Sequence, residues 1–367
     1  MSVVVIGGGV IGYSVAHALA VRGADVHVID MRGPGCGATQ ASAGMLAPYI
    51  EGHDETLLQL GVSSLALYDD FIGALDADAG QTTEYCRSGT LQVSRSLSHA
   101  EDLSRAGNRL SARDVAHKLL TREEAWNLEP LLAREVLRGL LVPTHGYVHV
   151  GDLMSALTGA SHRRGVVSRL DRVTGVEPAT NGVRVFTEGS SLAASAVVVA
   201  AGSWSGQVVL PDSPSIPVRP IRGQSIEMEF ATAPLSHVVW GEGCYLVPRR
   251  DGSVIVGATV EDVGFNESST PDGVEFLLSR AREILPSVAS ARVRDVRVGL
   301  RPATADELPL IGWSSTMRGV CLATGHYRNG ILLAPLTAKL VAEIVLGVED
   351  PETRWMREAV APSRLGL

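Results

Sequence analysis

The feature that most constrains this chain is a glycine pattern between two apolar segments near its N-terminus. Residues 3–6 are Val-Val-Val-Ile, a run that suits a strand buried on both faces. The glycines Gly7, Gly9 and Gly12 follow at once and open a stretch whose apolar residues recur at helical spacing. Residues 24–30 then alternate as a second strand. The pattern predicts a βαβ unit in a parallel sheet.

This glycine spacing is typical of dinucleotide-binding folds. Gly7 permits a tight turn, Gly9 lets the backbone approach a pyrophosphate, and Gly12 lets the helix pack closely on the strand. The helix N-terminus presents free N–H groups and the positive end of its dipole to the phosphates. Asp30, at the end of the second strand, can accept hydrogen bonds from ribose hydroxyls and disfavours a 2′-phosphate. The motif predicts a dinucleotide site but does not distinguish FAD from NAD.

Composition and charge narrow the classes of function. The net charge of −8 gives no electrostatic support for a nucleic-acid partner, and 5% aromatic residues make a poor platform for base stacking. The four cysteines are scattered, so we expect neither a metal site nor a disulfide framework. No apolar run has the length of a membrane span, and no basic residue precedes the N-terminal apolar run, as it would in a signal peptide. We therefore expect a cytoplasmic protein that acts on a small molecule, with no membrane partner.

Strand and helix patterns recur far from the N-terminus. Residues 196–202 are a second apolar run that ends in glycine, and residues 335–346 carry one apolar helical face. Residues 252–260 suit an antiparallel strand, whereas residues 52–140 have helical character. Because parts of the nucleotide-binding pattern lie at both ends of the chain, we expect a discontinuous domain.

Several further segments resemble the D-amino-acid oxidase family of flavoenzymes, and within it the glycine oxidase branch. They are ATQASAGMLAP at 38–48, VVVAAGSWS at 197–205, PIRGQ at 220–224, GLRPAT at 299–304, PLIG at 309–312 and GHYRNGILLAP at 325–335. They occur in the family's order, so the resemblance spans nearly the whole chain. The resemblance implies FAD as the cofactor. Cys321 is not at the position where sarcosine oxidase relatives attach flavin, so it implies non-covalent binding.

The resemblance also implies the fold. We expect an α/β protein in which a discontinuous Rossmann-type FAD-binding domain joins a second, mainly antiparallel-sheet substrate domain. The expected limits are residues 1–80, 150–210 and 296–367 for the FAD-binding domain, and residues 81–149 and 211–295 for the substrate-binding domain.

The family's cofactor contacts carry over to matching positions. Small residues at 41–44 would let the backbone approach a flat ring system, and Asn329-Gly330 before a helix at Pro335 would favour negative charge on the reduced flavin. His326 would lie beside the flavin through its backbone, so we assign it no acid–base role. The expected cofactor residues are Gly7, Gly9, Val10, Ile11, Gly12, Asp30, Met31, Ala38, Thr39, Ala43, Gly44, Met45, Val173, Gly202, His326, Tyr327, Arg328, Asn329, Gly330, Ile331 and Leu332.

Two residues match the family's substrate-binding groups. Arg301, in the GLRP segment, matches the arginine that holds a substrate carboxylate with a planar, two-pronged bond. Tyr245 matches a tyrosine that assists it, and these two are the predicted catalytic and substrate-binding residues. Arg328, Met45 and Val260 are further candidates for the pocket wall, with a surface ion pair or ordinary core packing as the alternatives.

The family's reaction is hydride transfer from the substrate Cα to flavin N5, which needs a neutral amine and fixed geometry more than a protein base. The imine would hydrolyse to glyoxylate or another 2-oxo acid plus ammonia or an amine, while dioxygen becomes hydrogen peroxide. We expect glycine or a small N-substituted glycine as substrate.

Other interpretations stay open from the sequence. They are an oxidase of sarcosine, iminodiacetate or D-amino acids, a flavin dehydrogenase with another acceptor, an NAD-linked dehydrogenase, and a non-catalytic FAD-binding module. Departures from the family at Gly151-Asp152 and Val260 bear on the substrate, because both are expected near it. A homo-oligomer is equally open.

Overall fold

The N-terminal βαβ unit is confirmed. The computed structural model describes residues 1–50 and 54–367. In it, β1 (Ser2–Ile6), α1 (Val10–Val21) and β2 (Asp25–Asp30) follow one another, and the two strands pair in parallel. Strand β1 is apolar on both faces because it lies inside a six-stranded sheet with the order β19-β20-β13-β1-β2-β9.

The other strands of this sheet come from distant parts of the sequence. They are β9 (Val167–Leu170), β13 (Ala196–Val199), β19 (Leu310–Trp313) and β20 (Val320–Thr324). Only the edge strand β19 pairs antiparallel. The sheet is therefore assembled from both ends and the middle of the chain, while the domain limits given above stay predictions.

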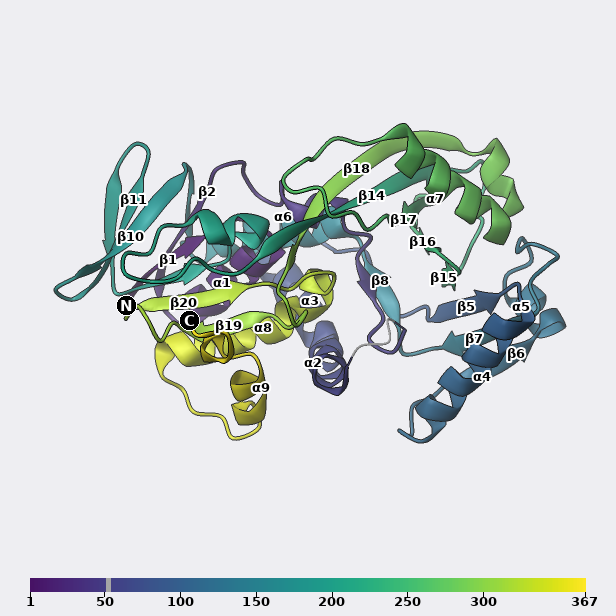
Figure 1. Ribbon diagram of the computed structural model, residues 1–367, viewed down its shortest axis with the longest axis horizontal. Coiled ribbons are helices and arrows are strands. Elements are labelled where there is room, and N and C mark those ends of the chain that lie inside the picture. Colours follow the sequence, from purple (N-terminus) through teal and green to yellow (C-terminus); the bar gives the residue numbers. More distant parts are fainter. Residues whose placement is uncertain (51–53) are drawn as a thin grey trace.

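Layers cover both faces of the parallel sheet (Figure 1). On one side the core is formed with four helices besides α1, namely α2 (Glu55–Ala66), α3 (Tyr68–Ala79), α6 (Val150–Arg163) and α8 (Gly330–Leu346). On the other side lies a three-stranded antiparallel sheet of β10 (Val173–Ala179), β11 (Gly182–Thr187) and β12 (Ser191–Ala194). This α/β fold is the predicted one.

Helix α8 corrects one boundary. The apolar spacing predicted a helix that starts at Pro335, but the helix begins at Gly330 and contains the proline. A proline inside a helix leaves the carbonyl four residues earlier without its usual donor. Here the Tyr68 hydroxyl donates to that carbonyl, of Ile331, at 2.5 Å. The helix is also not the last element, since α9 (Arg354–Ala359) and the short 3-10 helix η4 (Pro362–Leu365) follow it.

The second large sheet is eight-stranded, in the order β18-β14-β17-β16-β15-β5-β7-β6. Its strands are β5 (Thr90–Ser94), β6 (Lys118–Thr121), β7 (Arg138–Val142), β14 (Arg219–Glu229), β15 (Val238–Gly241), β16 (Cys244–Pro248), β17 (Ser253–Gly257) and β18 (Arg292–Ala303). The antiparallel setting predicted for residues 252–260 is confirmed by β17, which pairs antiparallel with β14 and β16. In Figure 1 this sheet, with its helices, forms the half of the molecule opposite the parallel sheet.

The expectation of helical character over residues 52–140 is only partly right for residues 54–140, and residues 52 and 53 lie outside the described part of the chain. Helices α2, α3, α4 (Leu97–Ser111) and α5 (Arg122–Leu128) lie there, but so do β4 (Tyr85–Cys86), β5, β6 and the start of β7. Strand β5 pairs with β15, more than a hundred residues away, and such pairing leaves no local periodicity to read.

Short elements complete the described chain. Strands β3 (Met45–Leu46), β8 (Gly146–Val148) and β4 form a small sheet, and α7 (Pro271–Ile284) packs on the large one. The remaining elements are the 3-10 helices η1 (Ala38–Ala41), η2 (Gly202–Gln207) and η3 (Pro286–Ser290). Within residues 1–50 and 54–367, no helix is both long and apolar enough to span a membrane.

Candidate active site

One cavity extends from the glycine-rich turn of the parallel sheet to the edge of the large antiparallel sheet. Most of the predicted cofactor and substrate residues line it together. They are Gly7, Gly9, Val10, Ile11, Asp30, Met31, Ala38, Thr39, Ala43, Gly44, Met45, Val173, Gly202, Tyr245, Arg301, His326, Tyr327, Arg328, Asn329, Gly330, Ile331 and Leu332. Gly12 and Val260 are absent from this lining.

At the nucleotide end of the cavity, different neighbours prevent a larger residue at Gly7 and at Gly12. Gly7 has a φ of +112°, and a Cβ there would overlap the carbonyl of Ala200 on the neighbouring strand end. Gly12 is not part of the cavity lining, and a Cβ there would overlap the Gly7 carbonyl. Gly12 therefore serves the close contact of helix and turn rather than touching a ligand.

The acidic residue after β2 shapes the same end. Asp30 accepts the N–H of Gly8 at 2.7 Å with one carboxylate oxygen, and the N–H groups of Arg32 and Gly33 at 2.7 and 2.8 Å with the other. Each carboxylate oxygen has two lone pairs, so the oxygen that accepts from Gly8 alone keeps capacity for one more hydrogen bond. It holds the glycine turn against the loop after β2.

The middle of the cavity has a wall of small residues. Gly44 has a φ of +75°, and a Cβ there would overlap the carbonyl of Val148. A Cβ at Gly299 would lie 2.8 Å from that of Ala41, so β18 approaches η1 more closely than a side chain at position 299 would allow. A flat ring system fits such a wall because no side chain projects from it.

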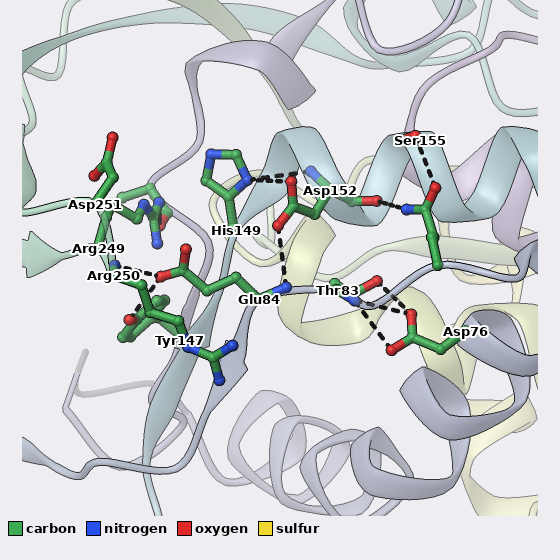
Figure 2. A network of polar contacts seen from close by, with 12 residues as sticks. Asp76, Thr83, Glu84, Tyr147, His149, Asp152, Ser155, Arg249, Arg250 and Asp251 are labelled. Atoms are coloured by element: carbon green, nitrogen blue, oxygen red, sulfur yellow. Dashed lines mark hydrogen bonds and ion pairs between the residues drawn. The ribbon is translucent and has the colours of Figure 1, made fainter.

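A polar network holds this wall from behind (Figure 2). Arg249 is buried, and its Nη2 donates to the carbonyl of Ala43 at 2.6 Å while its guanidinium lies 5.0 Å from the Tyr147 ring. The Tyr147 hydroxyl donates to Glu84 at 2.8 Å, and the same carboxylate accepts the N–H of Arg250 at 2.9 Å. Sequence reasoning missed Arg249, because no motif marks a side chain that reaches the cavity wall from outside.

The same network corrects the expectation for Gly151-Asp152. The Asp152 carboxylate accepts the N–H of Glu84 at 3.1 Å and lies 2.9 Å from the ring of His149. Gly151 and Asp152 lie in the first turn of α6, and neither lines the cavity. This departure from the family therefore acts on the support of the wall and not on the substrate directly.

At the far end of the wall lies the N-terminus of α8. The first residues of this 17-residue helix line the cavity, and the first turn of a helix has N–H groups without intrahelical acceptors. His326 lies just before it and is buried, with Nε2 2.9 Å from the Thr337 hydroxyl. Burial lowers the pKa of His326 to about 3, so its ring is neutral at ordinary pH. That is consistent with assigning it no acid–base role.

The two predicted substrate residues lie across glycines of neighbouring strands. A Cβ at Gly223 would overlap the Arg301 guanidinium, and a Cβ at Gly257 would overlap the Tyr245 hydroxyl. Arg301 Nη1 donates to the carbonyl of Thr259 at 2.9 Å and approaches that of Arg222 at 3.3 Å. Within the described part of the chain, Nη2 and Nε remain as donors for an anionic ligand.

The remaining candidates differ in placement. Met45 is half-buried and lines the cavity, whereas Arg328 is exposed at its rim with its guanidinium 5.2 Å from the Tyr327 ring. Val260 is 60% exposed, so the expectation that it forms a pocket wall does not hold in this structure. The reason is that β17 ends at Gly257, and Ala258 occupies the lining position instead.

The residues present fit FAD. The cavity joins a helix N-terminus after a glycine turn, where a pyrophosphate is stabilised, to a small-residue wall and a second helix N-terminus. Within the described residues, no group of His, Cys, Asp or Glu has the arrangement of a metal site. The geometry therefore offers one cavity for a dinucleotide, with the Arg301 guanidinium in its lining.

Comparison with known proteins places the chain among flavoenzymes. A family model described as DAO, FAD dependent oxidoreductase, matches residues 2–344. Glycine oxidase from Geobacillus kaustophilus is 33% identical over 347 residues, covering 94% of this chain and 92% of that protein. A crystal structure of glycine oxidase from the same species has a TM-score of 0.91 at 32% identity, with 95% of each chain covered.

Two further relatives bear on function. The bifunctional protein ThiO/ThiG of Trichormus variabilis is 35% identical over 358 residues, covering 94% of this chain but 52% of that protein. The chain thus spans about half the length of that relative. A crystal structure of iminodiacetate oxidase from Chelativorans sp. BNC1 has a TM-score of 0.89 at 27% identity, with 98% of both chains covered.

Proposed function

Because the chain belongs to the DAO family of FAD-dependent oxidoreductases, we propose that it oxidises glycine or a small N-substituted glycine with dioxygen as acceptor. For glycine the balance is glycine, dioxygen and water giving glyoxylate, ammonia and hydrogen peroxide. Bound FAD supplies the two-electron oxidant for this reaction.

The observation that carries the proposal is the position of Arg301. Its guanidinium lines the same cavity as the wall of small residues, and two backbone carbonyls accept hydrogen bonds from one of its nitrogens. A planar guanidinium with free donors matches a carboxylate in a bidentate manner. A substrate held there by its carboxylate would have its Cα and amine at a fixed place in the cavity, which is the geometry that the chemistry requires.

The rest of the lining supports amine oxidation without a protein base. His326 is buried and neutral, and the substrate end of the cavity offers Tyr245 as a hydroxyl partner for the carboxylate. Non-covalent FAD is part of the proposal. Within the described lining no cysteine is present, and burial in β20 raises the pKa of the Cys321 thiol to about 12.

A second candidate substrate is iminodiacetate. Its two carboxylates need two cations, and Arg328 lies at the rim of the cavity that Arg301 lines. The relative named iminodiacetate oxidase has the same fold over nearly the whole chain. Glycine and sarcosine would use Arg301 alone.

The test is Arg301→Ala with a peroxide assay over glycine, sarcosine, D-alanine and iminodiacetate at equal concentration. Losing a bidentate, charge-assisted contact should lower kcat/KM by roughly 30- to several-thousand-fold, or about 2–5 kcal/mol. Arg301→Lys should recover only part, because an ammonium has no fork. Flavin content should stay at the parent level in both.

Either of two results would contradict the proposal. One is an Arg301→Ala enzyme that oxidises its best substrate as well as the parent does. The other is a parent enzyme that prefers simple amines without a carboxylate.

A further inference from the structure

A cluster of polar side chains lies behind Arg301 and has no role in the proposed chemistry. Arg222 and Gln224 belong to β14, while Thr259 and Glu261 belong to the segment that follows β17. Arg222 is 4% exposed and Gln224 is completely buried. A buried cation and a buried amide require partners, and Glu261 contacts both, beside the carbonyl of Ser268 for Arg222 and Thr270 for Gln224.

Both carboxylate oxygens of Glu261 are engaged. Oε1 accepts from the Thr259 hydroxyl at 2.6 Å and from Gln224 Nε2 at 2.8 Å, while Oε2 pairs with the Arg222 guanidinium. Burial alone would raise the pKa of Glu261, but the hydrogen bonds from Arg222, Gln224 and Thr259 outweigh it and hold this pKa at about 2. The carboxylate is therefore charged throughout the neutral range.

The cluster connects directly to the substrate residue. The carbonyl oxygens of Thr259 and Arg222 are the two acceptors that hold Arg301 Nη1. Glu261 fixes both residues through their side chains, and its backbone pairs with that of Arg222 through hydrogen bonds of 2.8 and 3.0 Å. The Glu261 carboxylate thus reaches the Arg301 guanidinium by two routes. One runs through Thr259 and the other through Arg222.

Charge adds a second reason. Arg222 is the buried cation of this cluster, and its guanidinium pairs with Glu261 and donates to the carbonyl of Ser268 at 2.9 Å. The Glu261 carboxylate is the counter-charge of this guanidinium. Without the carboxylate, the buried Arg222 would lack a counter-charge, which would destabilise the part of β14 that carries the Arg222 carbonyl.

We propose that Glu261 is a positioning residue for the substrate carboxylate: it fixes the two carbonyls that orient Arg301 and neutralises Arg222. The inference rests on the proposed function of Arg301. Glu261 acts through other residues and does not line the cavity itself.

The chain offers a matched control beside it. Asp262 is the next residue and pairs with Arg219, but both side chains are mostly exposed, at 65% and 60%. Glu261→Gln and Asp262→Asn each remove one negative charge at almost the same place without changing side-chain size. Only the first removes a charge from the cluster behind Arg301.

The experiment measures kcat and KM for glycine and the affinity for acetate, a carboxylate without an amine, by titration of the flavin absorbance of the holoenzyme. For Glu261→Gln we expect KM and the acetate Kd to rise by roughly 10- to 100-fold, as for a weakened hydrogen bond to a charged group. We expect kcat to change much less and the flavin content to match the parent. Asp262→Asn should match the parent in every measurement.

A second pair of variants keeps the test decisive if Glu261→Gln folds poorly. Thr259→Val removes the hydroxyl that donates to Glu261, and Thr259→Ser retains it. We expect the same rise in KM and acetate Kd for the valine variant and recovery in the serine variant.

The inference is overturned if Glu261→Gln keeps the parent KM and acetate affinity. It is equally overturned if the only effects are lower thermal stability and lower flavin content, since these would show a merely structural role. The proposed function fails separately, if Arg301→Ala retains parent activity. When Arg301→Ala loses activity and Glu261→Gln matches Asp262→Asn, only the present inference is wrong.

Discussion

Gly223→Ala is the sharpest test of how the large sheet forms the substrate site. The Arg301 side chain crosses β14 at this glycine, and an added Cβ would overlap its guanidinium. The backbone itself tolerates alanine, because Gly223 lies in the strand and has no positive φ. The atom displaced is the end of a flexible side chain, so the fold can accommodate the methyl group while the guanidinium moves.

The expected magnitude follows from that displacement. Ordinary contact begins at 3.4 Å, so the guanidinium must shift by roughly 1 Å. A misplacement of that size costs about 100-fold in rate, which corresponds to about 2.7 kcal/mol. Hydrogen bonds to charged groups are worth about 1.5–3 kcal/mol each, so losing one prong of the fork gives the same range. We therefore expect kcat/KM for glycine to fall about 100-fold.

The assay compares Gly223→Ala with Gly73→Ala, a control in α3 where an added Cβ meets nothing within 4 Å. Steady-state kinetics, flavin content and melting temperature are measured for both. The double variant Gly223→Ala/Arg301→Ala should be no worse than Arg301→Ala alone, because both changes act through the same guanidinium. Full activity in Gly223→Ala, or additive losses in the double variant, would refute the reasoning.

The remaining predictions concern the cofactor and acid stability. Gly9→Leu should abolish flavin retention, because even a Cβ there lies 3.2 Å from the Thr39 hydroxyl and a larger side chain blocks the phosphate approach; a folded variant with the parent's visible absorbance would contradict this. His145 is buried, stacked at 5.5 Å on Tyr49, and burial lowers its pKa to about 3, so the folded protein loses stability as pH falls below the unfolded value of 6.5. His145→Phe should reduce the loss of unfolding free energy between pH 7 and pH 5 by about 2 kcal/mol in urea titrations, and an unchanged pH dependence would refute the assignment.

Local patterns account for the part of the fold that the sequence predicted. The βαβ unit follows from a β-branched run, a glycine turn and helical spacing, all within residues 2–30. Strands such as β5 were missed because their partners lie far away in the chain. The start of α8 was misplaced because a proline there is compatible with a helix only when another donor, the Tyr68 hydroxyl, uses the freed carbonyl.

In the site, too, local motifs identified some residues, whereas others depend on how distant strands pair. Arg301 and Tyr245 were found through motifs, and the structure brings them to one cavity. Their glycine neighbours, Gly223 and Gly257, depend on strand register: Tyr245 is directly opposite Gly257 across β16 and β17. Register between strands is a tertiary property, so neither glycine was recognisable as part of the site from spacing alone. The nearest signal was Gly223 itself, inside the PIRGQ segment.

The two ends of the cavity lie on different sheets, so cofactor binding and carboxylate binding can be perturbed separately. The nucleotide end is formed by the turn after β1. Gly223 and Arg301 lie in β14 and β18 of the antiparallel sheet, and Glu261 lies in the segment that follows β17. Arg249, directly after β16, ties the antiparallel sheet to the small-residue wall by donating to the carbonyl of Ala43. If the ends act independently, Gly223→Ala loses carboxylate binding with full flavin content, and Gly9→Leu loses flavin while β14 and β18 keep their structure. A Gly223→Ala protein that releases its flavin would show instead that carboxylate binding and cofactor binding share one set of contacts.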